Sequence, residues 1–191
     1  MNSFYKMDEL KQMKFKQLGN NVLISKMARF YNVDKIIIGS NVRIDDFCIL
    51  SGLITLGNNI HISAYSALFA GDEGIVIEDF SGISSRVTIY AITDDYSGKY
   101  LSNPTVPINY RNVIGGRVKL EKHVLIGSGS IVLPNVILRE GSSFGAMSLI
   151  NKSSEPWTIN VGIPTNKIKD RDKNLLKLEE KYLLEKTDED D

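Results

Sequence analysis

The chain has 191 residues, 23 basic and 23 acidic side chains, 42% hydrophobic residues and a single cysteine. This length and composition fit one folded domain with a sizeable core. The balanced charge gives no electrostatic reason to expect a nucleic acid as partner, and one cysteine excludes an intrachain disulfide or a multi-cysteine zinc site. The polar start and the lack of a long apolar run predict a cytoplasmic protein without a transmembrane segment.

Residues 1–32 are predicted to form an N-terminal helical cap. Over residues 3–18 the pattern is that of a short amphipathic helix, with Asp8 and Glu9 early and lysines later. Such a cap would cover the first coil of the repeat that follows.

A repeat of six residues dominates the sequence from residue 33 to residue 165. The repeat positions are all large and apolar, although the count breaks twice: Ile38, Ile44, Leu50, Leu56, Ile62, Leu68, Ile77, Ile83, Ile89, Leu120, Ile126, Val132, Leu138, Phe144 and Ile150. The fourth residue after most of these positions is small or β-branched, and Cys48 belongs to this second inward set. Helices and ordinary strands have periods of 3.6 and 2. A period of six predicts a parallel β-helix, whose stacked coils bury a continuous core.

The two breaks in the count mark insertions at about residues 69–76 and 90–119. Both follow a repeat position on the third face of the coil, so they are expected to leave the β-helix at one corner. Loops on a rigid scaffold are the usual place for function. The longer insertion is therefore predicted to be a protruding loop that contributes to the site. Residues 166–191 are predicted to form a C-terminal helix, at about 172–186, and an acidic tail.

Several blocks carry a family resemblance: IGSNVRIDDFCI, IEDFSGISSRVTI, KHVLIGSGSIVLPNV and the closing VGIPTNKIKD. They resemble the hexapeptide-repeat acyltransferases, most closely the galactoside and cell-surface polysaccharide O-acetyltransferases. The resemblance implies a left-handed β-helix, a homotrimer, and acetyl-CoA as the acyl donor. In that family the long arm reaches over a neighbouring subunit and walls the active site. A clasp that only joins the trimer is the simpler alternative.

The resemblance implies an acetyl transfer from acetyl-CoA to a sugar hydroxyl in the biosynthesis of a cell-surface polysaccharide or glycan precursor. N-acetylation of an amino-sugar nucleotide is an alternative on the same scaffold, and a noncatalytic trimeric β-helix is a third. The family's catalytic histidine sits just inside the long loop, where this chain has Asp94 and Asp95 instead. This departure strengthens the alternative of an amine acceptor, which needs less help from a base, while O-acetylation remains the main expectation.

Four residues are candidates for the catalytic work. A general base takes a proton from the acceptor, and histidine suits this role near neutral pH. The chain offers only His61 and His123, and across a trimer interface either could meet Asp94 or Asp95. His61, which faces outward beside the corner of the insertions, is preferred as the base, although the sequence does not decide between the two histidines. Ordinary surface histidines and loop-capping carboxylates are the alternatives, and the two histidines lack the spacing of a metal site.

The resemblance also implies a coenzyme A groove near the last coils. The matching residues combine small side chains with a basic closing turn: Gly127, Ser128, Gly145, Ala146, Ser148, Lys167 and Lys169. The lysines would meet the nucleotide phosphates as mobile point charges, unless they form only a solvated basic turn.

Overall fold

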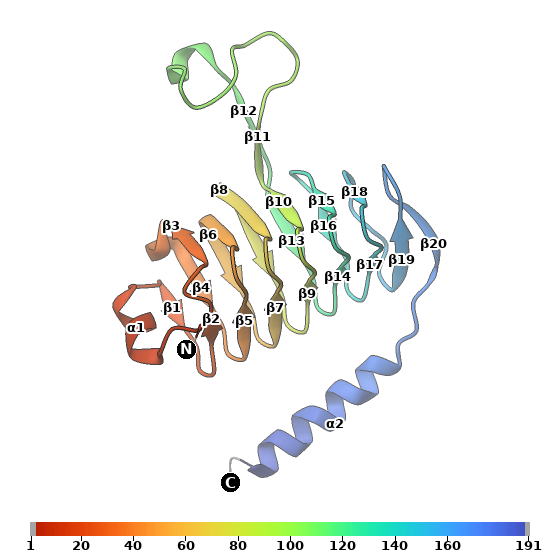
Figure 1. The fold of residues 1–191 in the computed structure, drawn as a ribbon. Helices are drawn as coiled ribbons and strands as arrows, with labels where there is room; N and C mark the ends of the chain where they lie inside the picture. The colour runs from red at the N-terminus through yellow and green to blue at the C-terminus, as the bar shows by residue number, and fades with distance from the viewer. Residues whose placement is uncertain (1–2, 190–191) are drawn as a thin grey trace.

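The computed structural model describes residues 3–189, side chains included up to residue 186, and shows a parallel β-helix with three faces (Figure 1). This is the all-β fold that the repeat predicts. On each face the strands of successive coils lie side by side in parallel register.

The strands divide among the three faces in rotation. The first face contains β1 (Gln17–Leu18), β4 (Ile36–Ile38), the second halves of β6 (Ile49–Leu56) and β8 (Ala67–Ile77), β13 (Val118–Leu120) and β16 (Ile137–Leu138). The second face contains β2 (Leu23–Ile24), β5 (Val42–Ile44), β7 (Ile60–Ile62), β9 (Gly82–Ile83), β14 (Leu125–Ile126), β17 (Ser143–Phe144) and β19 (Thr158–Val161). The third face contains β3 (Arg29–Tyr31), the first halves of β6 and β8, β10 (Thr88–Tyr90), β15 (Ile131–Val132) and β18 (Leu149–Ile150).

The core is the column of side chains enclosed by these faces. All fifteen predicted repeat positions are buried, the most exposed being Phe144 at 4%. The second inward set is buried as well, and its small members, such as Ser66 and Ser130, lie next to the tight corners. Burial raises the pKa of the Cys48 thiol to about 11, so this cysteine is a core residue and stays protonated near neutral pH.

The β-helix begins earlier than the sequence indicated. Helix α1 covers only Met7–Gln12, and β1 to β3 already form a coil that pairs with β4 to β6. Leu18, Ile24 and Phe30 continue the six-residue spacing backwards, but the 3-10 turn at Val33–Lys35 adds two residues and shifts the count. The cap is thus α1 alone, whose Leu10 is fully buried on the first coil.

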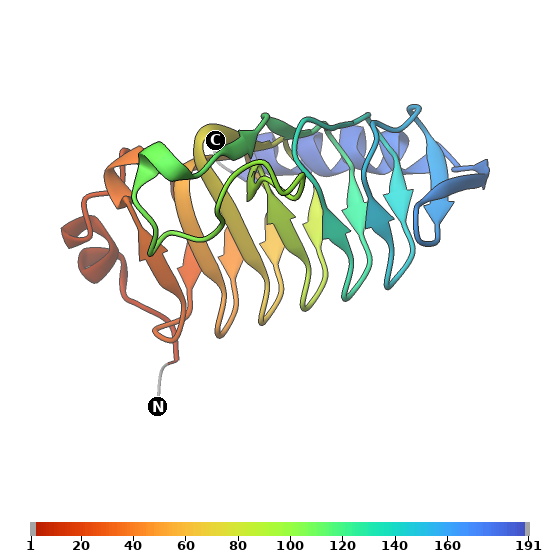
Figure 2. The same cartoon turned by 90° about the horizontal axis from the view of Figure 1, so that it is seen from above.

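The C-terminal end closes with a reversal and a helix. Strand β20 (Asn166–Asp170) pairs antiparallel with β19 and so ends the parallel stack. Helix α2 spans Asn174–Glu189, as the sequence predicted for about 172–186, and runs back along the coils (Figures 1 and 2). Residues 187–189 of the expected acidic tail belong to α2, and Asp190 and Asp191 lie outside the described residues.

Both insertions leave at the corner between the third and first faces, as predicted. The short one stays inside β8, as a widened corner around Gly71. The long one is an arm that stands away from the coils on β11 (Ile92–Asp94) and β12 (Val113–Gly115), an antiparallel pair, and carries the 3-10 turn Ile108–Tyr110 (Figure 1). A Cβ built on Gly71 would lie 2.8 Å from Ile92 Cγ2, which shows how closely the two insertions meet. Neither helix in the described part of the chain is long and apolar enough to cross a membrane.

Candidate active site

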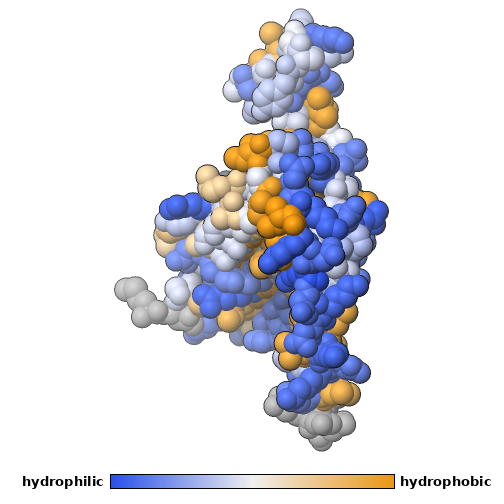
Figure 3. Space-filling view, turned by 90° about the vertical axis from the view of Figure 1, so that its right-hand side faces the viewer, coloured by the Kyte–Doolittle hydropathy of each residue, from blue (hydrophilic) through white to orange (hydrophobic). Residues whose placement is uncertain are grey.

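A cavity of about 860 Å³ lies where the arm meets the coils. Its coil side is apolar, with Ile131, Leu133 and Leu149 beside the stacked rings of Phe69 and Tyr90, whose centroids are 5.4 Å apart. Its arm side adds Asp94, Tyr96 and Arg111. In the space-filling view, hydrophobic surface lies below the base of the arm (Figure 3). The cavity thus offers apolar walls, one carboxylate and one guanidinium.

The structure separates the roles of the two predicted loop carboxylates. Asp95 accepts hydrogen bonds from the Ser97 backbone N–H, at 2.6 Å, and from Asn112 Nδ2, at 3.0 Å. The Asn112 and Ser97 hydrogen bonds lower the pKa of Asp95 to about 2. This is the loop-capping role. Within the described residues, the Asp94 carboxylate accepts a single hydrogen bond, 3.3 Å long, from the Asn103 N–H, and it lines the cavity. Asp94 is therefore the loop carboxylate placed to meet a ligand.

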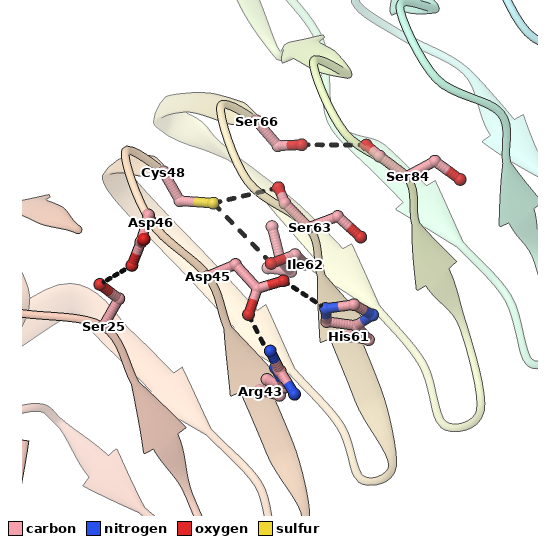
Figure 4. A network of polar contacts seen from close by, with 10 residues as sticks. All are labelled: Ser25, Arg43, Asp45, Asp46, Cys48, His61, Ile62, Ser63, Ser66 and Ser84. Carbon is pink, nitrogen blue, oxygen red and sulfur yellow. Dashed lines mark hydrogen bonds and ion pairs between the residues drawn. The ribbon is translucent and has the colours of Figure 1, made fainter. Parts of the chain in front are cut away.

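His61 points outward from β7 on the second face, as expected for a residue that precedes a repeat position. Its Nε2 lies 2.7 Å from Asp45 Oδ2, and Asp45 Oδ1 accepts a 2.7 Å bond from Arg43 Nε (Figure 4). Burial raises the pKa of Asp45, but the hydrogen bonds from Arg43 and His61 outweigh it, so this carboxylate stays ionised. His61 is thus oriented by a carboxylate, although not by Asp94 or Asp95.

His123 lies under helix α2 at the corner between the first and second faces. It is 6% exposed, its ring stacks on Phe80 at 5.4 Å, and its Nε2 lies 2.7 Å from Glu179 Oε2. Lys122 Nζ lies 2.7 Å from the other oxygen of Glu179. These contacts anchor α2 to the coils, so His123 has a structural role, and its role as a base stays a prediction. Within one chain, His61 and His123 line one cavity of about 440 Å³ under α2, and the arm carboxylates lie elsewhere, at the arm.

We expect Glu179→Gln to loosen α2. Burial raises the pKa of Glu179, but the bonds to Lys122 and His123 outweigh it, so the pKa lies below the ordinary value. The charge therefore stabilises the docked helix fully above about pH 4.3, and this stabilisation is lost as pH falls further. At pH 7, hydrogen exchange of α2 amides should be about ten times faster in Glu179→Gln. The exposed Glu185→Gln is the control, and equal rates in both variants would contradict the anchor.

The predicted coenzyme A residues lie in three different places. Gly127, Ser128, Gly145 and Ala146 form successive turns at the corner between the second and third faces, stacked by hydrogen bonds such as Met147 N–H to Ser128 O, at 2.9 Å. Ser148 points inward instead, is 2% exposed and donates to Gly145 O, so its side chain does not reach the surface. Lys167 and Lys169 lie on β20, where Lys167 pairs with Glu155 and Asp170.

Sequence reasoning passed over Ser84, which lies at this same corner. It directly follows β9, and its carbonyl accepts a 3.0 Å bond from Ser66 Oγ, while its own hydroxyl points away from that contact (Figure 4). The only signal in the sequence was its place just after a repeat position, which many polar residues share.

The structure and sequence were compared with known proteins. No family model matches the chain. It is 51% identical over 174 residues, 90% of each chain, to an Escherichia coli dTDP-4-amino-4,6-dideoxy-D-glucose acyltransferase. It is also 51% identical, with a TM-score of 0.96 over 98% of this chain and 100% of the other, to AntD, an N-acyltransferase from Bacillus cereus crystallised with dTDP and 3-hydroxybutyryl-CoA. The chain belongs to the hexapeptide-repeat acyltransferases.

These relatives fit the alternative of an amine acceptor better than the expectation of O-acetylation. The E. coli relative is an acyltransferase named for an amino sugar, and AntD is an N-acyltransferase. By contrast, a putative lipopolysaccharide biosynthesis O-acetyltransferase from E. coli K12 is 29% identical over 136 residues. The left-handed β-helix that the resemblance implied is confirmed. AntD has also been crystallised as S84A with dTDP-4-amino-4,6-dideoxyglucose and coenzyme A, and as D94N with dTDP and coenzyme A. This chain has Ser84 and Asp94 at the same two numbers.

Proposed function

We propose that this protein transfers an acyl group from an acyl-CoA to the amino group of a dTDP-linked 4-amino-4,6-dideoxy sugar. The observation that carries the proposal is the cavity at the base of the arm, where Asp94 lies beside apolar and aromatic walls. Sequence identity to amino-sugar N-acyltransferases over almost the whole chain supports it. O-acetylation, the first expectation from the sequence, is set aside in favour of the amine acceptor.

The chemistry needs no histidine in the arm. The nitrogen lone pair attacks the thioester carbonyl, the C–S bond breaks, and an amide and coenzyme A thiol result after one proton moves from nitrogen to sulfur. A sugar amine binds partly as its ammonium, which has no lone pair to donate. Asp94 would attract this cation, orient it, and accept one proton from it, which frees the lone pair before the nitrogen attacks. This role explains why a carboxylate can stand where the O-acetyltransferases have an imidazole.

A complete site would require more than one copy of the chain. Ser84 and Asp94 lie before and after β10, which crosses the entire third face. At about 3.3 Å per residue, the three residues of this strand alone span roughly 10 Å, farther than one pyranose ring reaches. In the homotrimer that the family resemblance implies, the arm of one copy would bring Asp94 to the Ser84 corner of the next. The predicted turns at Gly127 and Gly145 lie along that same corner, where the pantetheine arm would run.

If each active site is built from two copies of the chain, two inactive variants should complement each other. Chains carrying Ser84→Ala and chains carrying Asp94→Asn should each lose activity, yet mixed assemblies of the two contain sites with both residues intact. Coexpression should therefore give activity well above the sum of the separate variants. A mixture no more active than that sum would contradict a site built from two copies.

The amine reading also predicts that His61→Ala keeps turnover within about tenfold of the wild type. His61 faces outward from the second face and is held by Asp45, away from the arm cavity. Steady-state rates with the amino sugar would test this. A loss of about two to four orders of magnitude, the usual contribution of a general base, would contradict this prediction and indicate that His61 is the base.

The proposal is tested by the product. The protein is incubated with acetyl-CoA and dTDP-4-amino-4,6-dideoxyglucose, thiol release is followed, and the product is analysed by nuclear magnetic resonance. An acetamido group on carbon 4 is the expected result. Acetyl on an oxygen, or no thiol release with this acceptor, would contradict the proposal.

A further inference from the structure

One guanidinium in the arm cavity lacks the partners that such a group normally has. Nε of Arg111 is buried, and no hydrogen-bond acceptor for it exists among residues 3–189. The ion pairs found in the described part of the chain do not include Arg111 either. The backbone N–H of Arg111 donates a hydrogen bond to Ile108 O, at 3.3 Å. The unpaired group is therefore the Nε–H of the side chain.

An unpaired buried N–H of this kind is costly, and native proteins rarely leave one without a use. Guanidinium groups bind phosphate with two parallel hydrogen bonds, and the edge that contains Nε–H supports such a pair. Arg111 is therefore suited to an anionic ligand that enters the cavity.

The position of Asp94 narrows the choice of ligand. In the antiparallel pair of β11 and β12, Asp94 faces Val113, and Arg111 precedes Val113 by two residues, just outside β12. Both Asp94 and Arg111 line the cavity. The cavity thus presents a negative group and a positive group from neighbouring segments of the arm.

A 4-amino sugar nucleotide carries the complementary charges. Its amine and its first phosphate are attached on opposite sides of one pyranose ring. Coenzyme A also has a diphosphate, but it has no cationic group to place against Asp94. We propose that Arg111 binds the diphosphate of the sugar nucleotide, and that Arg111 and Asp94 together orient the sugar across the cavity. This inference rests on the proposed function and adds a positioning residue for the acceptor.

Calorimetry with three ligands on the full chain tests the assignment. With dTDP, Arg111→Gln should raise the Kd by about 10- to 100-fold, because two charge-assisted hydrogen bonds are lost. The Kd of Arg111→Lys for dTDP should fall between those of the wild type and Arg111→Gln, since a lysine keeps the charge but cannot form two parallel hydrogen bonds. Thymidine, which has no phosphate, and coenzyme A should bind the wild type and Arg111→Gln equally. Arg117→Gln, at the returning end of the insertion, is the matched control and should bind dTDP like the wild type.

The outcomes separate the two proposals. If the wild type binds dTDP and Arg111→Gln binds it as tightly, the assignment of Arg111 is wrong while the proposed function stands. If Arg111→Gln weakens coenzyme A and leaves dTDP unchanged, the arginine serves the donor, and the assignment is again wrong. If the wild type binds no dTDP, both proposals fail. Because Arg111 lacks a side-chain partner without ligand, Arg111→Gln should melt no lower than the wild type, so weaker binding would not reflect unfolding.

Discussion

Replacing Asp94 with asparagine should lower turnover with the amino-sugar acceptor by about two to four orders of magnitude. The asparagine keeps the size and one acceptor oxygen, but it neither attracts an ammonium nor accepts its proton. Asp94 has only one long hydrogen bond, from Asn103, so the substitution should leave the arm in place. Steady-state kinetics at saturating acyl-CoA measure the effect, and the affinity for dTDP should stay within a few-fold.

Asp95→Asn is the control for Asp94→Asn, because the neighbouring side chain caps the loop through Ser97 and Asn112 and an asparagine retains an acceptor for those bonds. Its turnover should stay within about tenfold of the wild type. Equal losses in the two variants would mean that the shape of the arm, and not the charge at residue 94, controls the rate. Full activity of Asp94→Asn would remove this carboxylate from the mechanism.

The second large effect concerns the fold. Ile126→Asp should prevent folding, because Ile126 is fully buried in β14, stacked between Ile83 and Phe144. A carboxylate enclosed there without a partner costs more than about 4 kcal/mol, a large part of the 5–15 kcal/mol that stabilises a typical domain. The variant should appear in the insoluble fraction or show no cooperative thermal transition.

The adjacent residue supplies the control for Ile126→Asp. Leu125 lies on the same strand, but its side chain points outward and is 44% exposed. Leu125→Asp should fold and melt within a few degrees of the wild type. If Leu125→Asp failed to fold and Ile126→Asp folded normally, the inward register of this strand would be contradicted.

The repeat made most of the fold predictable. A six-residue period predicts a parallel β-helix, in which each repeat position packs against the equivalent positions of the coils above and below. The structure confirms the inward direction of all fifteen repeat positions, including those that follow the two insertions. The first coil was missed because the turn at Val33–Lys35 shifts the phase by two residues. Local sequence patterns do not reveal such a shift. In addition, the early acidic residues and later lysines within residues 3–18 resemble those of a helix, although α1 covers only Met7–Gln12.

The site was predictable only in part. Asp94 was a candidate because it stands where the family has a histidine, and its separation from Asp95 depends on hydrogen bonds that only the folded arm defines. His123 was a candidate because histidines are scarce, yet its burial depends on Glu179, 56 residues away on α2. Ser148 appeared in both the inward set and the coenzyme A set, and the structure places it inside. Arg111 belongs to no sequence motif. It is recognised only because the folded arm places it in the same cavity as Asp94.

A matched pair of acceptors tests the central claim most directly. One is dTDP-4-amino-4,6-dideoxyglucose and the other is the same nucleotide sugar with a hydroxyl in place of the amine. With acetyl-CoA as donor, kcat/KM for the amine should exceed that for the hydroxyl by at least about a thousandfold, because Asp94 attracts a cation and no imidazole serves an alcohol. Equal values, or a preference for the hydroxyl, would contradict amine acylation and restore the O-acetyltransferase reading.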